Sequence, residues 1–90
     1  MRILANDGID PIGKKLLEEA GIEVDTVNIP QAELASKLNA YDGITVRSAT
    51  KVRKDLIDAC PNLKIIGRGG VGMDNIDVEY AKSKGVAVEN

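Results

Sequence analysis

Apolar runs recur along this chain at an even spacing, with segments of helical periodicity between them. The runs begin near Arg2, Ile22, Gly43, Lys64 and Val86, which is about one every 20 residues. Repetition of a strand, a helix and a short loop produces βα units, whose strands lie parallel because each helix returns the chain to the same end of the sheet. The pattern therefore predicts a parallel sheet of five strands joined by helical crossovers.

The helical segments carry start and stop signals. In the first segment, Asp10 is a candidate N-cap, Pro11 suits the first helical position and Gly21 can adopt the left-handed conformation that ends a helix. The apolar positions of this helix form one stripe: Ile12, Leu16, Leu17 and Ala20. The other helices are expected after Pro30, over residues 52–59, and over residues 78–84 between a cap at Asp77 and a stop at Gly85.

The strands differ in a way that predicts their order. The segment from Ile22 to Asp25 alternates apolar with charged residues, as an edge strand does, whereas the strands near Gly43 and Lys64 are more nearly apolar throughout. An edge position for the second strand fits the flavodoxin-like order 2-1-3-4-5, with helices on both faces. We expect an α/β, doubly wound, flavodoxin-like fold in which residues 1–90 form a single domain.

Composition narrows the range of partners. The net charge of −2, with basic and acidic residues interspersed, argues against nucleic acid and membranes as partners, because both require a dominant positive field. The chain has no histidine, so it lacks the usual general base near neutral pH and the commonest metal ligand. Cys60 is expected to be a buried small hydrophobe. The start at Met1-Arg2-Ile3-Leu4 resembles no leader, so we expect a cytoplasmic protein.

Hydrogen-bond donors gather where the predicted strands end. In a parallel sheet the loops after all strands emerge at one edge, so residues 6–8, residues 47–50 and residues 67–72 should converge. These loops supply guanidinium groups, hydroxyl groups and glycine-flanked backbone amides, which suit a carboxylate or a phosphate. The sequence therefore predicts a local anion site at this edge.

The glycine run, residues 67–72, has the G-x-G-x-x-G spacing of a dinucleotide-binding loop, and Glu89 follows at about the distance of its ribose-binding acid. A dinucleotide loop requires the helix to begin within the glycine run, so that its first amides meet the pyrophosphate. Here the helix is predicted to begin only after Asp77, and the run follows the fourth strand rather than the first. We therefore favour a substrate anion and keep nucleotide binding as an alternative.

Three segments carry a resemblance to a known family: residues 46–52 (VRSATKV), residues 63–77 (LKIIGRGGVGMDNID) and residues 85–90 (GVAVEN). On these segments the chain resembles the substrate-binding portion of the D-2-hydroxyacid dehydrogenase family. The first segment points to the branch that oxidises 3-phospho-D-glycerate to 3-phosphohydroxypyruvate with NAD, in serine biosynthesis. The resemblance covers essentially the whole chain and implies the flavodoxin-like fold.

The resemblance also implies which residues bind substrate: Arg47, Ser48, Arg68, Gly70, Val71 and Gly72. The backbone amides of the last three would hold the substrate carboxylate, while the two arginines would meet the negative groups with Ser48 as a hydroxyl partner. In this family a separate Rossmann domain carries NAD and the catalytic arginine, glutamate and histidine. We expect this chain to hold no catalytic, cofactor or metal site, to bind its anion weakly and to be inactive in hydride transfer alone. The alternative is a domain that self-associates through faces the Rossmann domain would cover, or exchanges a terminal unit.

Overall fold

The computed structural model describes residues 1–69 and 74–89. Within these residues five parallel strands form one sheet in the order β2-β1-β3-β4-β5. The strands are β1 (Arg2–Ala5), β2 (Glu23–Asp25), β3 (Gly43–Val46), β4 (Ile65–Arg68) and β5 (Ala87–Glu89). The flavodoxin-like order predicted from the sequence is confirmed, and β2 is an edge strand.

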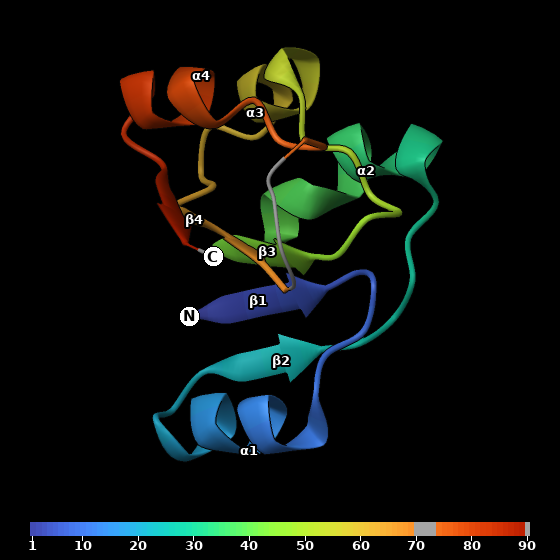
Figure 1. Cartoon of the computed structure of the whole chain (residues 1–90), viewed down its shortest axis with the longest axis vertical. Coiled ribbons are helices and arrows are strands. Elements are labelled where there is room, and N and C mark those ends of the chain that lie inside the picture. Colours follow the sequence, from blue (N-terminus) through green and yellow to red (C-terminus); the bar gives the residue numbers. More distant parts are fainter. Residues whose placement is uncertain (70–73, 90) are drawn as a thin grey trace.

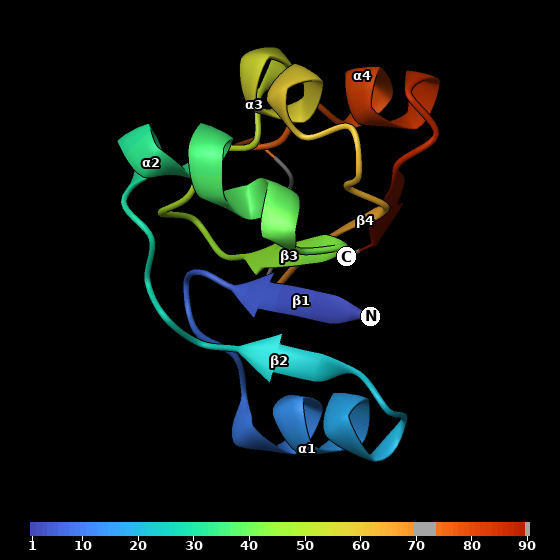
Figure 2. The same ribbon diagram turned by 180° about the vertical axis from the view of Figure 1, so that it is seen from behind.

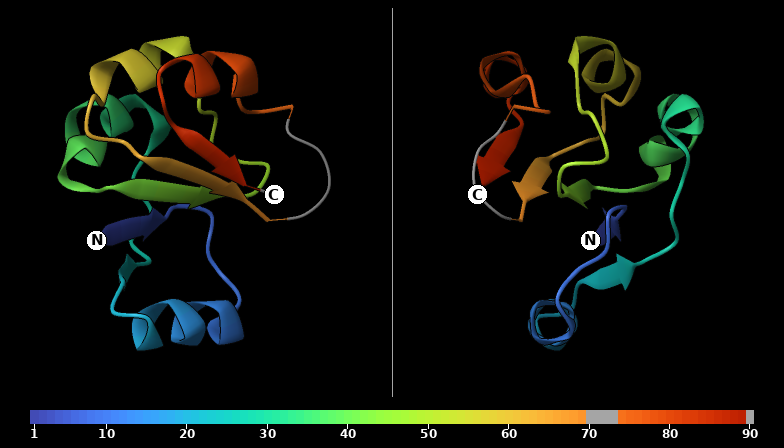
Figure 3. Two further views of the ribbon diagram at one scale, coloured as in Figure 1. Left: turned by 90° about the vertical axis from the view of Figure 1, so that its left-hand side faces the viewer. Right: turned by 45° about the vertical axis from the view of Figure 1, so that its right-hand side comes forward.

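The helices cover the two faces of the sheet unequally. They are α1 (Pro11–Glu19), α2 (Gln31–Lys37) with a following 3-10 turn η1 (Leu38–Ala40), α3 (Lys54–Ala59) and α4 (Val78–Ser83). Figures 1 and 2 show α2, α3 and α4 on one face and α1 on the other, beside β2. The right-hand view of Figure 3 shows α1 at the β2 end of its face, with the strands toward β5 left without a helix on that side.

The buried core lies under α2, α3 and α4. Alternate residues of the central strands, Leu4, Ile44 and Ile66, point into it and are fully buried. The predicted apolar stripe of α1 is not buried in this way, because α1 packs alone on its face against the sheet edge. No residue of α1, all of which the structure describes, is buried, and Ile12 and Leu16 are 72% and 62% exposed.

The helix boundaries follow the capping signals with one exception. Asp10 accepts a hydrogen bond from the Ile12 amide at 2.8 Å, and Gly21 and Gly85 adopt φ values of 86° and 81°. The predicted start of the third helix at Val52 is wrong, because α3 begins at Lys54. Val52 instead forms a parallel bridge with Ile76, and this bridge ties the segment after β3 to the segment after β4.

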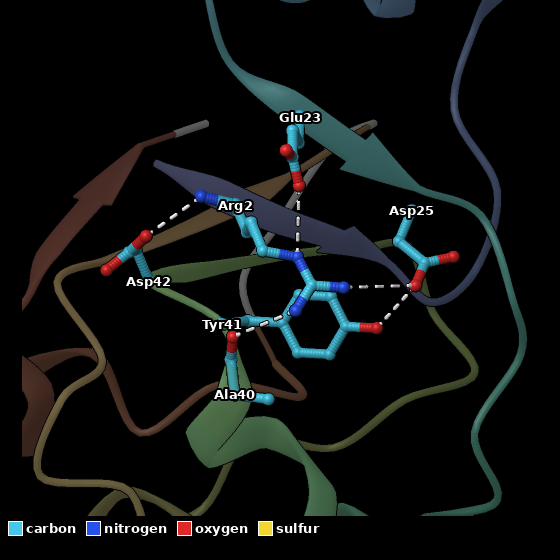
Figure 4. Close-up of polar contacts among 6 residues, drawn as sticks. All are labelled: Arg2, Glu23, Asp25, Ala40, Tyr41 and Asp42. Carbon is cyan, nitrogen blue, oxygen red and sulfur yellow. Dashed lines mark hydrogen bonds and ion pairs between the residues drawn. The ribbon is translucent and has the colours of Figure 1, made fainter.

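A polar cluster holds the edge strand β2 to the rest of the sheet (Figure 4). The Arg2 guanidinium lies 4.7 Å from the centre of the Tyr41 ring and forms an ion pair with Glu23 at 3.2 Å. The Tyr41 hydroxyl donates to the Asp25 carboxylate. Burial and the hydrogen bond to Asp25 raise the pKa of Tyr41, and the same bond lowers the pKa of Asp25. The cluster therefore ties β2 to β1 and to the residue that follows η1.

Cys60 is buried and packs in the core, and burial raises the pKa of its thiol, as expected of a small hydrophobe. No helix of the described residues has the length and apolar character needed to cross a bilayer.

Candidate anion-binding site

The loops after β1 and β3 meet through Asp7. Its carboxylate accepts hydrogen bonds from the Arg47 amide at 2.7 Å, from the Thr50 amide at 3.0 Å and from the Thr50 hydroxyl at 2.6 Å. Partial burial, the largest single influence, raises the pKa of Asp7, but the hydrogen bonds from Thr50, Arg47 and Ala49 together lower it overall. Asp7 therefore remains ionised and fixes the backbone of the loop that carries Arg47 and Ser48.

Asn6 supports this loop from beneath. It is buried, its amide nitrogen donates to the Thr50 hydroxyl at 2.9 Å and to the Ile29 carbonyl at 3.0 Å, and its oxygen accepts from the Ile29 amide at 2.7 Å. All three hydrogen bonds connect segments distant in sequence. Asn6 and Asp7 together thus hold Thr50 rigidly at the carboxyl edge of the sheet.

The loops after β3 and β4 meet through Asn75. Its amide nitrogen donates to the carbonyl oxygens of Arg47 at 2.7 Å and Thr50 at 2.6 Å, and its oxygen accepts from Arg68 Nε at 2.8 Å. The predicted convergence of the post-strand loops is therefore confirmed for residues 6–8, residues 47–50 and the described part of the glycine run.

Cavities lie on both sides of this junction. One, of about 310 Å³, is lined by Ser48, Lys51, Arg53, Arg68, Asp74 and Asn75; we call it the basic cavity. Another, of about 360 Å³, opens on the less covered face of the sheet and includes Arg47, Gly67, Arg68, Gly69 and Glu89; we call it the sheet-face cavity. Arg47 and Ser48 thus line different cavities, although they are adjacent in sequence, and Arg68 lines both.

The basic cavity has the charge that suits an anion. Among the described residues that line it, Lys51, Arg53 and Arg68 outnumber the one carboxylate, that of Asp74. Arg53 also forms an ion pair with Asp77 at 3.3 Å, but both side chains are partly exposed, so this pair holds Arg53 only weakly. Lys51 and Arg53 therefore add positive charge to the cavity beside that of Arg68.

The backbone of Lys51 is held at both of its polar groups. The Gln31 amide donates to the Lys51 carbonyl and accepts from the Lys51 amide, each at 2.9 Å. Sequence reasoning missed Gln31 and Asn75 as parts of this site. For Asn75, the one signal of a place in the site was its position in the loop after β4. The sequence near Gln31 indicated only the start of a helix.

Three of the expected site residues, Gly70, Val71 and Gly72, lie outside the described residues. The helix after the glycine run is described, and it begins at Val78, well after Gly72. The late start of this helix, which was predicted from the sequence, is therefore confirmed. Among the described residues, no group of His, Cys, Asp and Glu side chains is placed to hold a metal ion.

Relatives of known name match over nearly the whole chain. D-3-phosphoglycerate dehydrogenase of Rattus norvegicus is 43% identical over 90 residues, which are 99% of this chain and 17% of the relative. Hydroxypyruvate reductase of Thermotoga maritima is 44% identical over 99% of this chain and 29% of its own length. The crystal structure of NAD⁺-bound 3-phosphoglycerate dehydrogenase from Entamoeba histolytica superimposes with a TM-score of 0.80 at 29% identity, over 98% of this chain and 32% of that one.

The chain therefore spans less than a third of the length of these relatives. A family model described as the catalytic domain of D-isomer-specific 2-hydroxyacid dehydrogenases matches residues 3–90. Because this match covers nearly all of the sequence, the chain belongs to the D-isomer-specific 2-hydroxyacid dehydrogenase family.

Proposed function

We propose that this chain is the substrate-binding part of an NAD-dependent dehydrogenase that acts on 3-phosphoglycerate in serine biosynthesis in the cytoplasm. The observation that carries the proposal is the basic cavity, where Ser48 and Arg68 from neighbouring loops lie with Lys51 and Arg53. The names of the relatives support the substrate, since D-3-phosphoglycerate dehydrogenases are among those more than 40% identical.

Within this proposal the chain binds and orients substrate, while the reaction itself takes place with a second domain. Arginine pairs with carboxylate or phosphate through two parallel hydrogen bonds, which fix direction as well as charge. Arg68, which lines both cavities, and Arg47, which lines the sheet-face cavity, fill this role. Ser48 donates its hydroxyl, and the backbone amides of Gly70, Val71 and Gly72 take the carboxylate. In the complete enzyme, NAD would supply the hydride-transfer chemistry, and the residues of this chain would hold the substrate in place for it.

The isolated chain should bind its substrate weakly, because one set of anchors without a closing domain leaves the ligand largely in water. We expect a dissociation constant in the millimolar range or weaker, which corresponds to about 4 kcal/mol or less. We also expect no turnover with NAD.

A titration followed through backbone amide resonances tests the proposal. With 3-phosphoglycerate, the amides of residues 47–51 and of the glycine run should shift at millimolar concentration, and glycerate, which lacks the phosphate, should bind several-fold more weakly. Micromolar binding of NAD, or shifts confined to residues far from the carboxyl edge, would contradict the proposal. Equal affinities for glycerate and 3-phosphoglycerate would instead favour an unphosphorylated substrate. Hydroxypyruvate, for which the hydroxypyruvate reductase among the relatives is named, is a substrate of that kind.

A second candidate function is self-association of this chain. Ile12 and Leu16 of α1 are exposed. Figure 3 shows that the sheet face on the α1 side carries no described helix toward β5, and a second copy of the chain could cover this face and α1 together. Light scattering over a range of concentrations tests this candidate. A concentration-dependent dimer that Leu16→Lys abolishes would support it, and a monomer at millimolar concentration would exclude it.

A further inference from the structure

Asn75 joins the two arginine-bearing loops of the site through a single buried side chain. The residue is 4% exposed, and its side-chain amide forms three hydrogen bonds within the protein. It accepts from Arg68 Nε and donates to the carbonyl oxygens of Arg47 and Thr50. A buried amide that satisfies both its oxygen and its nitrogen in this way has one orientation available.

The hydrogen bond to Nε matters because Nε is the guanidinium nitrogen nearest the side-chain stem. A partner at Nε, together with the Gly69 carbonyl that accepts from Nη1 at 2.9 Å, fixes the plane of the Arg68 guanidinium at two points. An arginine held in this way loses its side-chain freedom on folding rather than on binding. The affinity for an anion is then higher than that of an arginine free to rotate.

The backbone around Asn75 is anchored independently of its side chain. The Val52 amide donates to the Asn75 carbonyl at 2.9 Å, and the Asp77 amide donates to the Val52 carbonyl at 3.0 Å. Truncation of the Asn75 side chain therefore removes the contacts to Arg68 and to the two carbonyls while these main-chain bonds remain.

We infer that Asn75 is a positioning residue, which orients the Arg68 guanidinium between the basic cavity and the sheet-face cavity so that it meets a bound anion. This inference rests on the proposed function for the identity of the site as an anion site. Asn75 itself lines the basic cavity, but its role is exerted through Arg68.

A double-mutant cycle on the 90-residue chain, with inorganic phosphate as the probe at constant ionic strength, tests the inference. We expect Asn75→Ala to weaken phosphate binding by about three- to tenfold in the wild-type background and by less than about twofold in the Arg68→Ala background. Asn28→Ala is the matched control, since Asn28 also donates to a backbone carbonyl at this edge, that of Asn6, at 2.7 Å. In this control, the dissociation constant for phosphate should stay within twofold of the wild-type value.

The outcomes separate the inference from the proposed function. If wild-type chain does not bind phosphate, the proposed anion site fails, and the role of Asn75 fails with it. If wild-type chain binds phosphate and Asn75→Ala weakens binding by the same factor in both backgrounds, the effect is a general loss of structure, and only the inference is overturned.

A spectroscopic measurement covers the case in which Asn75→Ala does not fold. In the wild-type chain, the Nε proton of Arg68 should exchange with water at least several-fold more slowly than that of Arg53, whose ion pair with Asp77 is made through Nη1. Asn75→Asp keeps the accepting oxygen but loses both N–H donors, so it should lower stability yet retain this protection. Equal exchange rates for Arg68 and Arg53 in the wild-type chain would overturn the inference.

Discussion

The carboxylate of Asp77 accepts a hydrogen bond from the backbone amide of Lys54 at 2.9 Å, so the residue that precedes α4 caps α3. The sequence predicted Asp77 as the cap of α4, but its side chain makes no capping bond to that helix. The bridge between Val52 and Ile76 explains the difference, because it brings the start of α3 beside Asp77. The starts of two helices are thereby coupled through one carboxylate.

Asp77→Ala should therefore destabilise the start of α3 as well as the segment that leads into α4. We expect a loss of about 1 kcal/mol in the free energy of unfolding, measured by urea denaturation, because an N-cap contributes about that amount. Asp10→Ala, which removes the cap of α1, is the matched control of similar size. Hydrogen exchange should then be faster at the first amides of α3 in Asp77→Ala and unchanged there in Asp10→Ala; faster exchange confined to α4 would contradict the coupling.

Two glycines should respond in opposite ways to alanine. A Cβ at Gly43 would lie 2.6 Å from Ile65 Cγ2 and 3.0 Å from the Ile65 carbonyl oxygen, so β3 and β4 would have to separate. We expect Gly43→Ala to cost about 1–3 kcal/mol of stability. A Cβ at Gly13, within α1, would meet Ile9 at an ordinary 3.7 Å, so Gly13→Ala should stabilise by about 0.5–1 kcal/mol. Thermal denaturation of both variants checks the signs.

Acid should weaken the chain partly through Asp7. Its pKa is lowered in the folded state, so its contribution to stability is complete above the ordinary aspartate pKa of about 3.9 and is lost as the pH falls through the lower folded value. Asp7→Asn should therefore flatten the dependence of the unfolding free energy on pH below about pH 4. Asp55→Asn, at an exposed position of α3, is the control, and a wild-type-like pH dependence in Asp7→Asn would refute this role.

The Tyr41 hydroxyl should stabilise the sheet edge until it ionises. Because its pKa is raised in the folded state, its contribution is complete below the ordinary tyrosine pKa of about 10 and is lost as the pH rises through the higher folded value. Tyr41→Phe should lower stability at neutral pH by about 0.5–1.5 kcal/mol, the range for a hydrogen bond. Tyr80→Phe removes a similar bond to Asp58 at an exposed position and should cost less, as denaturant titration of the two variants will show.

The fold could be predicted because its determinants are local. Each strand and helix has its own apolar pattern and its own punctuation, as at Asp10 and Gly21, and the polar alternation of β2 placed that strand at the edge. The apolar stripe of α1, in contrast, does not lead to burial. Ile12 and Leu16 have the right spacing, but burial depends on what lies opposite the helix, which the sequence of the helix does not encode.

The site was predictable at the level of loops and not at the level of contacts. Parallel topology alone brought Arg47, Ser48 and Arg68 to one edge, yet it did not separate Arg47 from Ser48 into different cavities. The hydrogen bonds of Asp7 with Thr50 and of Asn75 with Arg47 join residues 43 and 28 positions apart. Such bonds depend on side-chain direction in the assembled sheet, so they leave no pattern in any short window of sequence.

Asp7 and Asn75 join the loops that follow β1, β3 and β4, which are the three inner strands of the sheet, and Asn6 adds the segment after β2 through Ile29. The native state binds an anion at this junction, whereas the unfolded chain has no such site. The binding free energy therefore adds to the free energy of unfolding. At a concentration ten times its dissociation constant, a ligand raises the unfolding free energy by about 1.4 kcal/mol. A ligand-induced rise in melting temperature would therefore report the assembly of the strands whose loops form this junction.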